Sequence, residues 1–149
     1  MTNLRDCELT PYEDGPDGHR FSGRSLARDI GAERTGFGLY ELEPGQSTWP
    51  YHFELGSEEW LLVVDGEVTL RTPDGERGLR AGDLVCFPEG PEGAHAVRND
   101  SDATARFAMP SVDEPTNAAI YPDANSFVLH GPGFEHRAKL GDPIDYWET

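Results

Sequence analysis

Four side chains of the types that bind metal ions occur in the middle of the chain. His52 and Glu54 are two residues apart, Glu59 follows shortly after, and His95 lies further along. Side chains at i and i+2 of a β-strand point to the same face, so a strand would place His52 and Glu54 side by side. Imidazole and carboxylate together suit a divalent ion such as manganese, iron(II), zinc or nickel. The alternative is that Glu54, Glu58 and Glu59 form a solvated run of charge, with each histidine a satisfied surface or core residue.

The segments that carry these residues have the pattern of short strands separated by turns. The 17 glycines and 12 prolines lie between short apolar segments, which indicates many turns and many strands. The pair Asp65-Gly66 predicts a hairpin, and residues 25–32 are the best helical candidate, ended by Gly31. The expected strands are residues 35–42, 49–55, 59–64, 67–71, 83–87, 94–98, 103–109 and 126–129. Strands at this spacing favour an all-β sandwich or jelly roll.

The segment 59–64 is apolar on both faces. Leu61 and Val63 share one face with Glu59, and the other face carries Trp60, Leu62 and Val64. One face would point into a barrel, while the other needs a second sheet, an arm or a partner subunit. We expect an arm from a second copy to cover part of that face, which predicts a two-fold homodimer.

Charge and hydropathy exclude several classes of function. The chain has 12 Lys and Arg against 28 Asp and Glu, a formal net charge of −16, so phosphate backbones and anionic membranes should repel it. The longest apolar run, residues 60–64, is too short to span a membrane, and residues 1–10 lack the apolar centre of a secretion signal. These features predict a cytoplasmic protein that binds neither nucleic acid nor membrane. Cys7 and Cys86 are too few for a disulfide scaffold, and Cys86 is expected to be a small buried hydrophobe.

The residues around the candidate ligands resemble the two motifs of the cupin superfamily. The first block runs Gly45, His52, Glu54, Glu59, Gly66, and the second runs Gly82, Pro88, Gly90, His95, Asn99. The spacings from Glu59 to Gly66, from Gly82 to Pro88 and from His95 to Asn99 fit the family. The resemblance covers about residues 35–110 and is closest to small single-domain bacterial cupins.

Three departures from the family pattern accompany this resemblance. Glu54 stands where the first motif has its second histidine. Four residues separate Gly90 from His95 where the family has two, and one extra residue lies between Gly45 and His52. A looser loop of proline and glycine can absorb the longer gap before His95.

The resemblance implies a cupin-type jelly-roll barrel, also called a double-stranded β-helix, that holds a metal inside. We expect the barrel over residues 19–130, a flexible N-terminal arm over residues 1–18 and a C-terminal, loop-like arm over residues 131–149. Carried over position by position, the ligands would be His52, Glu59 and His95, with Glu54 at the remaining ligand position.

The carboxylate at position 54 leaves three arrangements open. If Glu54 coordinates, two histidines and two carboxylates leave a divalent ion neutral and favour manganese or iron(II). If Glu54 turns away, His52, Glu59 and His95 remain as the two-histidine, one-carboxylate set of oxygen-using iron(II) sites. In the third arrangement the site holds no metal.

Two classes of function fit the resemblance. The first is a metal-dependent enzyme acting on a small molecule as an oxygenase, isomerase, lyase or decarboxylase. The second is a non-catalytic cupin that binds a small molecule, with or without metal. Because cupin folds host many activities, the fold does not choose between them. The remaining histidines, His19, His130 and His136, are expected at the surface.

Overall fold

The computed structural model describes residues 1–12, 14–142 and 147, and its regular structure is almost entirely β-strand. The larger sheet contains β1 (Thr10–Tyr12), β2 (Phe21–Ser25), β3 (Gly36–Leu42), β4 (Phe53–Asp65), β7 (Leu84–Phe87), β9 (Ala105–Tyr121), β10 (Ser126–Gly131) and β11 (Phe134–Lys139). The smaller sheet contains β5 (Glu67–Thr72), β6 (Gly75–Arg80) and β8 (Ala96–Arg98). Three short 3₁₀ turns complete the elements: η1 (Arg28–Ile30), η2 (Pro91–Gly93) and η3 (Pro122–Ala124).

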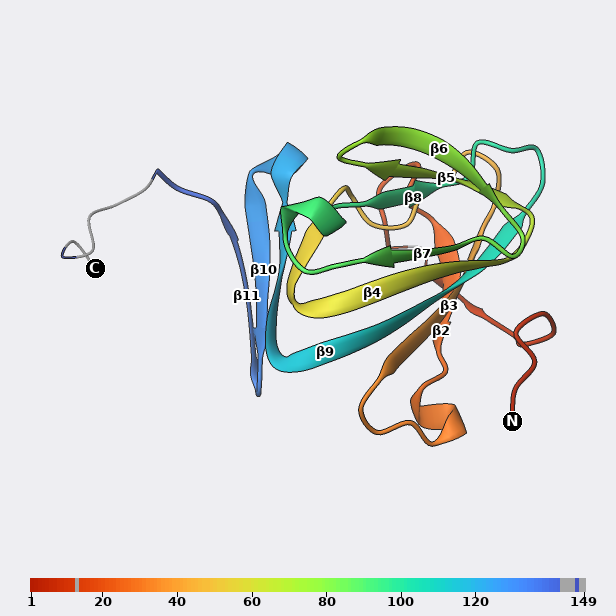
Figure 1. Ribbon diagram of the computed structural model, residues 1–149, viewed down its shortest axis with the longest axis horizontal. Helices are drawn as coiled ribbons and strands as arrows, with labels where there is room; N and C mark the ends of the chain where they lie inside the picture. The colour runs from red at the N-terminus through yellow and green to blue at the C-terminus, as the bar shows by residue number, and fades with distance from the viewer. Residues whose placement is uncertain (13, 143–146, 148–149) are drawn as a thin grey trace.

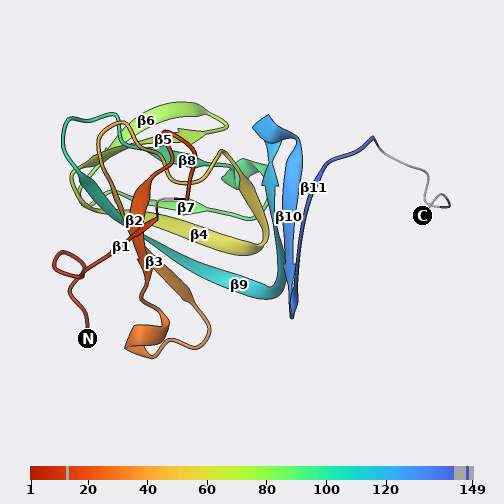
Figure 2. The same ribbon diagram turned by 180° about the vertical axis from the view of Figure 1, so that it is seen from behind.

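The long strand β9 organises the larger sheet. It pairs with β4 along most of its length, with β3 near its beginning and with β10 near its end, always antiparallel. Figure 1 shows β4 and β9 running together as one layer, with β5, β6 and β8 as the layer above and the β10–β11 hairpin standing at one end. Figure 2 shows the same two layers from behind. The prediction of an all-β jelly-roll barrel is confirmed.

The core lies between the two sheets and follows the two-residue period of the strands. Leu61 and Val63 of β4 are almost fully buried, and so are Leu70 of β5 and Phe107 of β9. Burying side chains of this size contributes about 1.5–3 kcal/mol each relative to leaving them exposed. Leu61 and Val63 therefore point into the barrel. Glu59, two positions before Leu61, lies on the same strand.

The hairpin predicted at Asp65-Gly66 does not form. Strand β4 pairs with β7 and β9, whereas β5 pairs with β6 and β8, so the chain passes from one sheet to the other at this point. Gly66 makes the passage with a φ of 73°, and a Cβ there would lie 2.8 Å from the Thr104 carbonyl oxygen. The turn was predicted correctly, but the partner of each strand depends on contacts distant in sequence.

Other expected elements have different extents in the structure. The segments expected as separate strands at 49–55 and 59–64 form one strand, β4, which begins at Phe53. The helical candidate at 25–32 forms only the single 3₁₀ turn η1, followed by Gly31 in the left-handed region. The loop-like reading of residues 134–139 is wrong, because they form β11 against β10. Residues 143–146, 148 and 149 of the expected C-terminal arm lie outside the described residues.

The outer face of β4 is only partly covered. Near its end, Val64 packs in a cluster with Leu4, Cys7 and Leu9 from the first residues of the same chain, and β1 pairs with β2. The chain's own N-terminal residues thus take part of the place expected for the arm of a second copy. Trp60 is still 43% exposed on this face. Among the described residues, no helix has the length and apolar character needed to cross a membrane.

Candidate metal centre

The two candidate histidines lie opposite each other on paired backbone. The amide of His52 donates to the carbonyl of His95 over 3.1 Å, and the amide of His95 donates to the carbonyl of His52 over 2.8 Å. This isolated antiparallel bridge, outside the named strands, brings together residues that are far apart in sequence. The ring centroids are 4.7 Å apart. Backbone pairing therefore fixes the separation of the two imidazoles before any ion binds.

Each imidazole is held by a backbone carbonyl two residues earlier in the chain. Nδ1 of His52 lies 2.8 Å from the Pro50 carbonyl oxygen, and Nδ1 of His95 lies 2.9 Å from that of Gly93. A carbonyl oxygen can only accept, so Nδ1 must carry the proton in both rings. In the neutral imidazole, the lone pair is then on Nε2. This arrangement is typical of histidines that bind a metal through Nε2.

Burial keeps both histidines neutral. Removal from water lowers the pKa of His52, an effect that the hydrogen bond to Pro50 only partly opposes. Burial, with a smaller contribution from the neighbouring His52, lowers the pKa of His95 to about 3. Phe87 stacks on the His95 ring with centroids 3.8 Å apart. Neutral imidazole is the form that coordinates a cation, so both groups are in the required state at neutral pH.

A break in the regular pleat brings both carboxylates to the site. On an unbroken strand, Glu54 and Glu59 would point to opposite faces, because Glu59 is five positions after Glu54 and an odd offset changes the face. The register between β4 and β9 shifts between Leu55 and Ser57, and Gly56 has a φ of 77°. Glu54 and Glu59 consequently line the same cavity. The sequence indicated the shared face of His52 and Glu54, but it predicted two strands, 49–55 and 59–64, where the structure has one strand with a bulge at Gly56.

Three of the four expected ligands form a close group. One ligand atom each from His52, Glu59 and His95 lies within 4.8 Å of the other two. Two atoms bound to one ion at about 2.0–2.2 Å can be separated by at most about 4.4 Å, so small adjustments would bring the group onto one ion. Glu54 is outside this group, with its Oε1 3.5 Å from Nε2 of His52.

One buried nitrogen is the strongest sign that the group fits a cation. Nε2 of His95 is buried and has no hydrogen-bond partner in the described part of the chain. Its nearest carboxylate oxygen, Oε2 of Glu59, is 3.6 Å away, which is beyond hydrogen-bonding distance. A polar group buried in this way costs about 1–3 kcal/mol, and a bound cation would offset that cost.

A cavity of about 380 Å³ opens beside these residues. Its lining includes aromatic and hydroxyl side chains that the sequence did not single out as functional: Tyr40, Trp49, Ser111 and Tyr121. Tyr121 stacks on His52 with centroids 5.5 Å apart. His130, expected at the surface, also lines the cavity, whereas Cys86, expected to be buried, is exposed. Strands β9 and β10 bring Tyr121 and His130 here through pairing over long sequence distances.

Burial also fixes the protonation of the two phenols. It raises the pKa of Tyr40 to about 12, and the charge of Glu59 acts in the same direction. Burial raises the pKa of Tyr121 as well, with a smaller contribution from Glu54. Both phenols therefore keep their protons at neutral pH and can donate hydrogen bonds into the cavity.

The barrel therefore holds an inward-facing group of two histidines and a carboxylate beside a cavity. The cupin domain family matches residues 38–110, which include all four expected ligands. Together with the fold, this match shows that the chain belongs to the cupin superfamily. No curated protein matches the chain.

Some solved structures match this chain along most of its length and most of their own. A sugar phosphate isomerase of the cupin superfamily from Silicibacter pomeroyi is 26% identical, with a TM-score of 0.83 over 98% of this chain and 97% of that one. A protein from Acidithiobacillus ferrooxidans is 22% identical, with a TM-score of 0.84 over 95% and 91%. The polyketide cyclase RemF from Streptomyces resistomycificus is 24% identical, with a TM-score of 0.62 over 76% and 79%. The second and third similarities concern the fold alone.

Proposed function

We propose that the chain is a metal-dependent cupin enzyme that acts on a small molecule through a mononuclear divalent centre. The ligands are His52, Glu59 and His95, and Glu54 is the fourth ligand after a small rotation. The ion is manganese, iron(II), zinc or nickel. The observation that carries the proposal is Nε2 of His95, which is buried within ligand distance of His52 and Glu59 and has no hydrogen-bond partner in the described residues.

The separations between neighbouring ligand atoms support one shared ion. Around a tetrahedral ion with bonds of about 2.1 Å, ligand atoms are about 3.4 Å apart. Nε2 of His52 lies 3.5 Å from Oε1 of Glu54, and Nε2 of His95 lies 3.6 Å from Oε2 of Glu59. The backbone carbonyls of Pro50 and Gly93 hold the rings in the ligating tautomer. Two carboxylates would neutralise the charge of a divalent ion.

Among the reaction classes open to cupins, we propose an isomerase acting on a hydroxy-carbonyl compound. A bound divalent ion supplies Lewis acidity that polarises a substrate oxygen. Tyr40 and Tyr121 orient the substrate by donating hydrogen bonds from phenols that stay protonated. The similarity to the Silicibacter pomeroyi isomerase along nearly the whole of both chains supports this class.

Metal analysis tests the centre directly. Protein purified without chelator should contain about one equivalent of a divalent transition metal, and calorimetric titration of the stripped protein should show one site. His95→Ala should abolish that binding, while His136→Ala, at an exposed position on β11, should leave it unchanged. Absence of metal binding in the wild-type protein would overturn the proposal.

The reaction class needs a separate assay. Incubation of the loaded protein with hydroxy-carbonyl compounds, followed by proton NMR, should show conversion to an isomer without oxygen consumption. Oxygen uptake would assign an oxygenase instead. A compound that binds and is recovered unchanged would assign the non-catalytic binding function.

We also propose that the chain forms a homodimer through the outer face of β4, β7 and β9. The exposed apolar side chains there are Trp60, Leu84 and Val112. The register places β4 between β7 and β9, so the three residues share one surface. Burial of such a surface against a second copy is the usual way in which a symmetric dimer forms.

A further inference from the structure

The cavity beside the proposed metal centre contains acidic groups but no permanently cationic side chain. Glu54 and Glu59 both line it. None of the 12 Lys and Arg residues of the chain does, and all 12 belong to the described residues. With a divalent ion bound, the two carboxylates bring the site to about zero charge; without one, the site carries about two negative charges. In neither state does the cavity offer a counter-charge to an anion.

Two arginines on the strands around the cavity, Arg24 and Arg137, are already engaged by carboxylates. Arg24, next to the cavity-lining Ser25, donates twice to Asp29 over 2.8 and 2.9 Å. Arg137 of β11 donates to Glu135 over 2.8 Å. Releasing either guanidinium for a ligand would break an existing ion pair. Ion pairs at the surface are weak. A phosphate that displaced a carboxylate from one of these arginines would still gain little binding energy, because one anion would only take the place of another.

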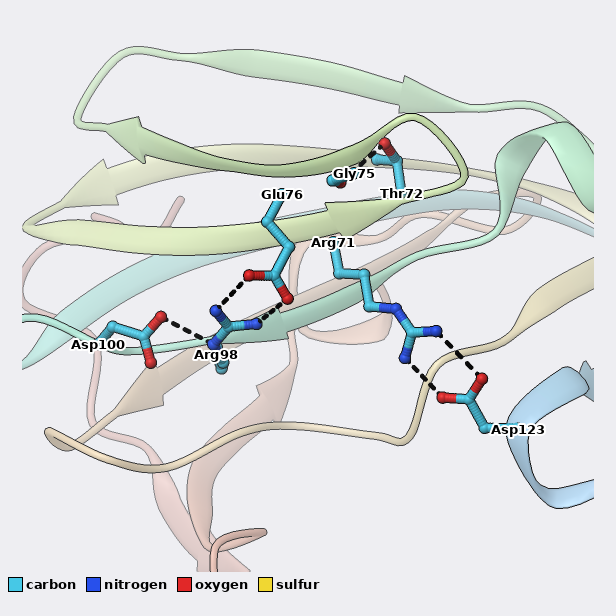
Figure 3. A network of polar contacts seen from close by, with 7 residues as sticks. All are labelled: Arg71, Thr72, Gly75, Glu76, Arg98, Asp100 and Asp123. Atoms are coloured by element: carbon cyan, nitrogen blue, oxygen red, sulfur yellow. Dashed lines mark hydrogen bonds and ion pairs between the residues drawn. The ribbon is translucent and has the colours of Figure 1, made fainter.

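A second hollow, also lined by Trp49, contains two further arginines that are likewise paired with carboxylates. Arg98 forms a bidentate pair with Glu76 and a further bond to Asp100, and Arg71 forms a bidentate pair with Asp123 (Figure 3). Figure 3 shows both guanidinium groups turned toward these carboxylates. Among the described residues, neither the cavity nor this second hollow therefore offers an unpaired guanidinium group to a phosphate.

His130 is the remaining group at the cavity that could become cationic. Its Nδ1 lies 3.4 Å from Oε2 of Glu135, so the histidine also has a carboxylate partner. A phosphate ester would bring a charge of about −1.5 to −2 into this setting. The chain's net charge of −16 would oppose the approach of an anion at longer range.

The polar groups of the cavity match hydroxyl groups. Carboxylates accept hydrogen bonds, neutral phenols donate them, and each hydroxyl group of a ligand can do both. Tyr40 and Tyr121 supply the donors, and Glu54 and Glu59 supply the acceptors. With the metal bound, the neutral site gives a cationic ligand no net attraction either, and such a ligand would compete with the metal for Glu54 and Glu59. An uncharged compound with several hydroxyl groups meets none of these penalties.

We infer that the cavity takes an uncharged, polyhydroxylated small molecule, such as a free sugar, and discriminates against the corresponding phosphate. This inference rests on the proposed function and names the substrate class of the same site. The ligand inferred for this chain therefore differs from the sugar phosphate that appears in the name of the Silicibacter pomeroyi protein.

The test compares ligands that differ only in a phosphate group. Saturation-transfer NMR with the zinc-loaded and the metal-free protein would use glucose and glucose 6-phosphate, fructose and fructose 6-phosphate, and ribose and ribose 5-phosphate. For at least one pair, the free sugar should bind at least about tenfold more tightly than its phosphate, because the cavity offers the phosphate no counter-charge and, without metal, places it beside two carboxylates.

Two variants show whether the charge of the cavity causes the preference. Ser25→Arg adds a cation to the lining and should reduce the preference for the free sugar at least about threefold by binding the phosphate more tightly. Ser22→Arg adds the same charge on the same strand β2, but Ser22 lines a different hollow, so the preference should be unchanged. An equal effect of the two variants would overturn the inference.

The outcomes separate the inference from the proposed function. Equal or tighter binding of the phosphates to the wild-type protein, or no binding of any sugar to a protein that binds zinc, would overturn the inference and leave the metal centre standing. Failure to bind zinc would overturn the proposed centre. The metal-free arm would then still test the charge argument, because both carboxylates remain in the cavity.

Discussion

At the scale of single residues, the site is prepared by contacts that fix where the protons lie. Both histidines donate from Nδ1 to a carbonyl of the residue two positions earlier, so neither can present a proton at Nε2 while neutral. Burial, with a smaller contribution from His52, lowers the pKa of His95 to about 3. The metal-free protein therefore contains an unprotonated imidazole that the unfolded chain would protonate below pH 6.5.

This difference predicts that the metal-free protein loses stability in mild acid. The pKa of His95 is lower in the folded state than the ordinary 6.5, so its stabilising contribution is complete above pH 6.5 and falls as the pH decreases toward 3. At pH 5, 1.5 units below the ordinary value, the loss is about 2 kcal/mol. Urea unfolding in EDTA at pH 7 and pH 5 measures it. His95→Gln should show a smaller loss between the two pH values, with the part due to His52 remaining, and the exposed His136→Gln should keep the full loss; equal losses in all three proteins would contradict the prediction.

The carboxylate at position 54 should set the metal preference. Glu54→His would exchange an oxygen donor for a nitrogen donor and change the bound site from neutral to a net charge of +1. Zinc and nickel binding should strengthen relative to manganese. Glu54→Ala should weaken manganese binding by roughly tenfold or more, as loss of a supporting ligand does. Calorimetric titration of the three proteins decides this, and an unchanged metal preference in Glu54→His would show that Glu54 does not coordinate.

At the scale of elements, the sequence predicted local structure better than pairing. Strand β3 carries the aromatic residues Phe37 and Tyr40 beside two leucines, and it was expected almost where it lies, at Gly36–Leu42. Strands β6 and β11 were missed because their sequences are largely charged and their residues mostly exposed. The second half of β9 contains Pro115 and few apolar residues, yet it pairs with β4 and β10. Sheet partners supply these strands with the stability that their own sequences do not indicate.

The candidate ligands were predictable and their surroundings were not. Spacing within a strand and the motif resemblance indicated His52, Glu54, Glu59 and His95, and the structure brings three of them together. Tyr121 and His130 reach the cavity through β9 and β10, whose pairing depends on residues far away in sequence. No local pattern around either residue distinguishes it from an ordinary strand residue.

The bulge at Gly56 should be required both for stability and for metal affinity. Its φ of 77° is unfavourable for any residue with a Cβ, and a Cβ there would lie 3.0 Å from the Thr116 carbonyl oxygen. Gly56→Ala should lower the free energy of unfolding by about 1–2 kcal/mol. It should also weaken metal binding, because the bulge sets Glu54 relative to Glu59. Gly78→Ala, where a Cβ meets open space, is the matched control, and equal metal affinity in both variants would contradict the role given to the bulge.

At the scale of the whole molecule, charge and apolar surface act in opposite directions. Two copies that each carry a net charge of −16 repel each other. This repulsion weakens with rising ionic strength because salt screens the charges. The apolar surface around Trp60, Leu84 and Val112 favours association. The chain's own N-terminal residues cover the part of this face near Val64 and leave the part near Trp60 open. A dimer through that open part should therefore tighten with added salt.

Replacement of the tryptophan should separate the two copies without disturbing the metal centre. Trp60 points away from the barrel and its indole nitrogen donates to Sγ of Cys86 on the neighbouring strand, so the side chain belongs to the outer surface. Trp60→Glu places a charge at the centre of the proposed interface and should convert the dimer to a monomer at micromolar concentration. Phe134→Glu, at an exposed position on β11, should leave the dimer intact. Light scattering at low and high salt measures the mass, and a wild-type monomer under both conditions would exclude the interface. Manganese titration of Trp60→Glu should give the wild-type affinity, because the four proposed ligands all come from one chain.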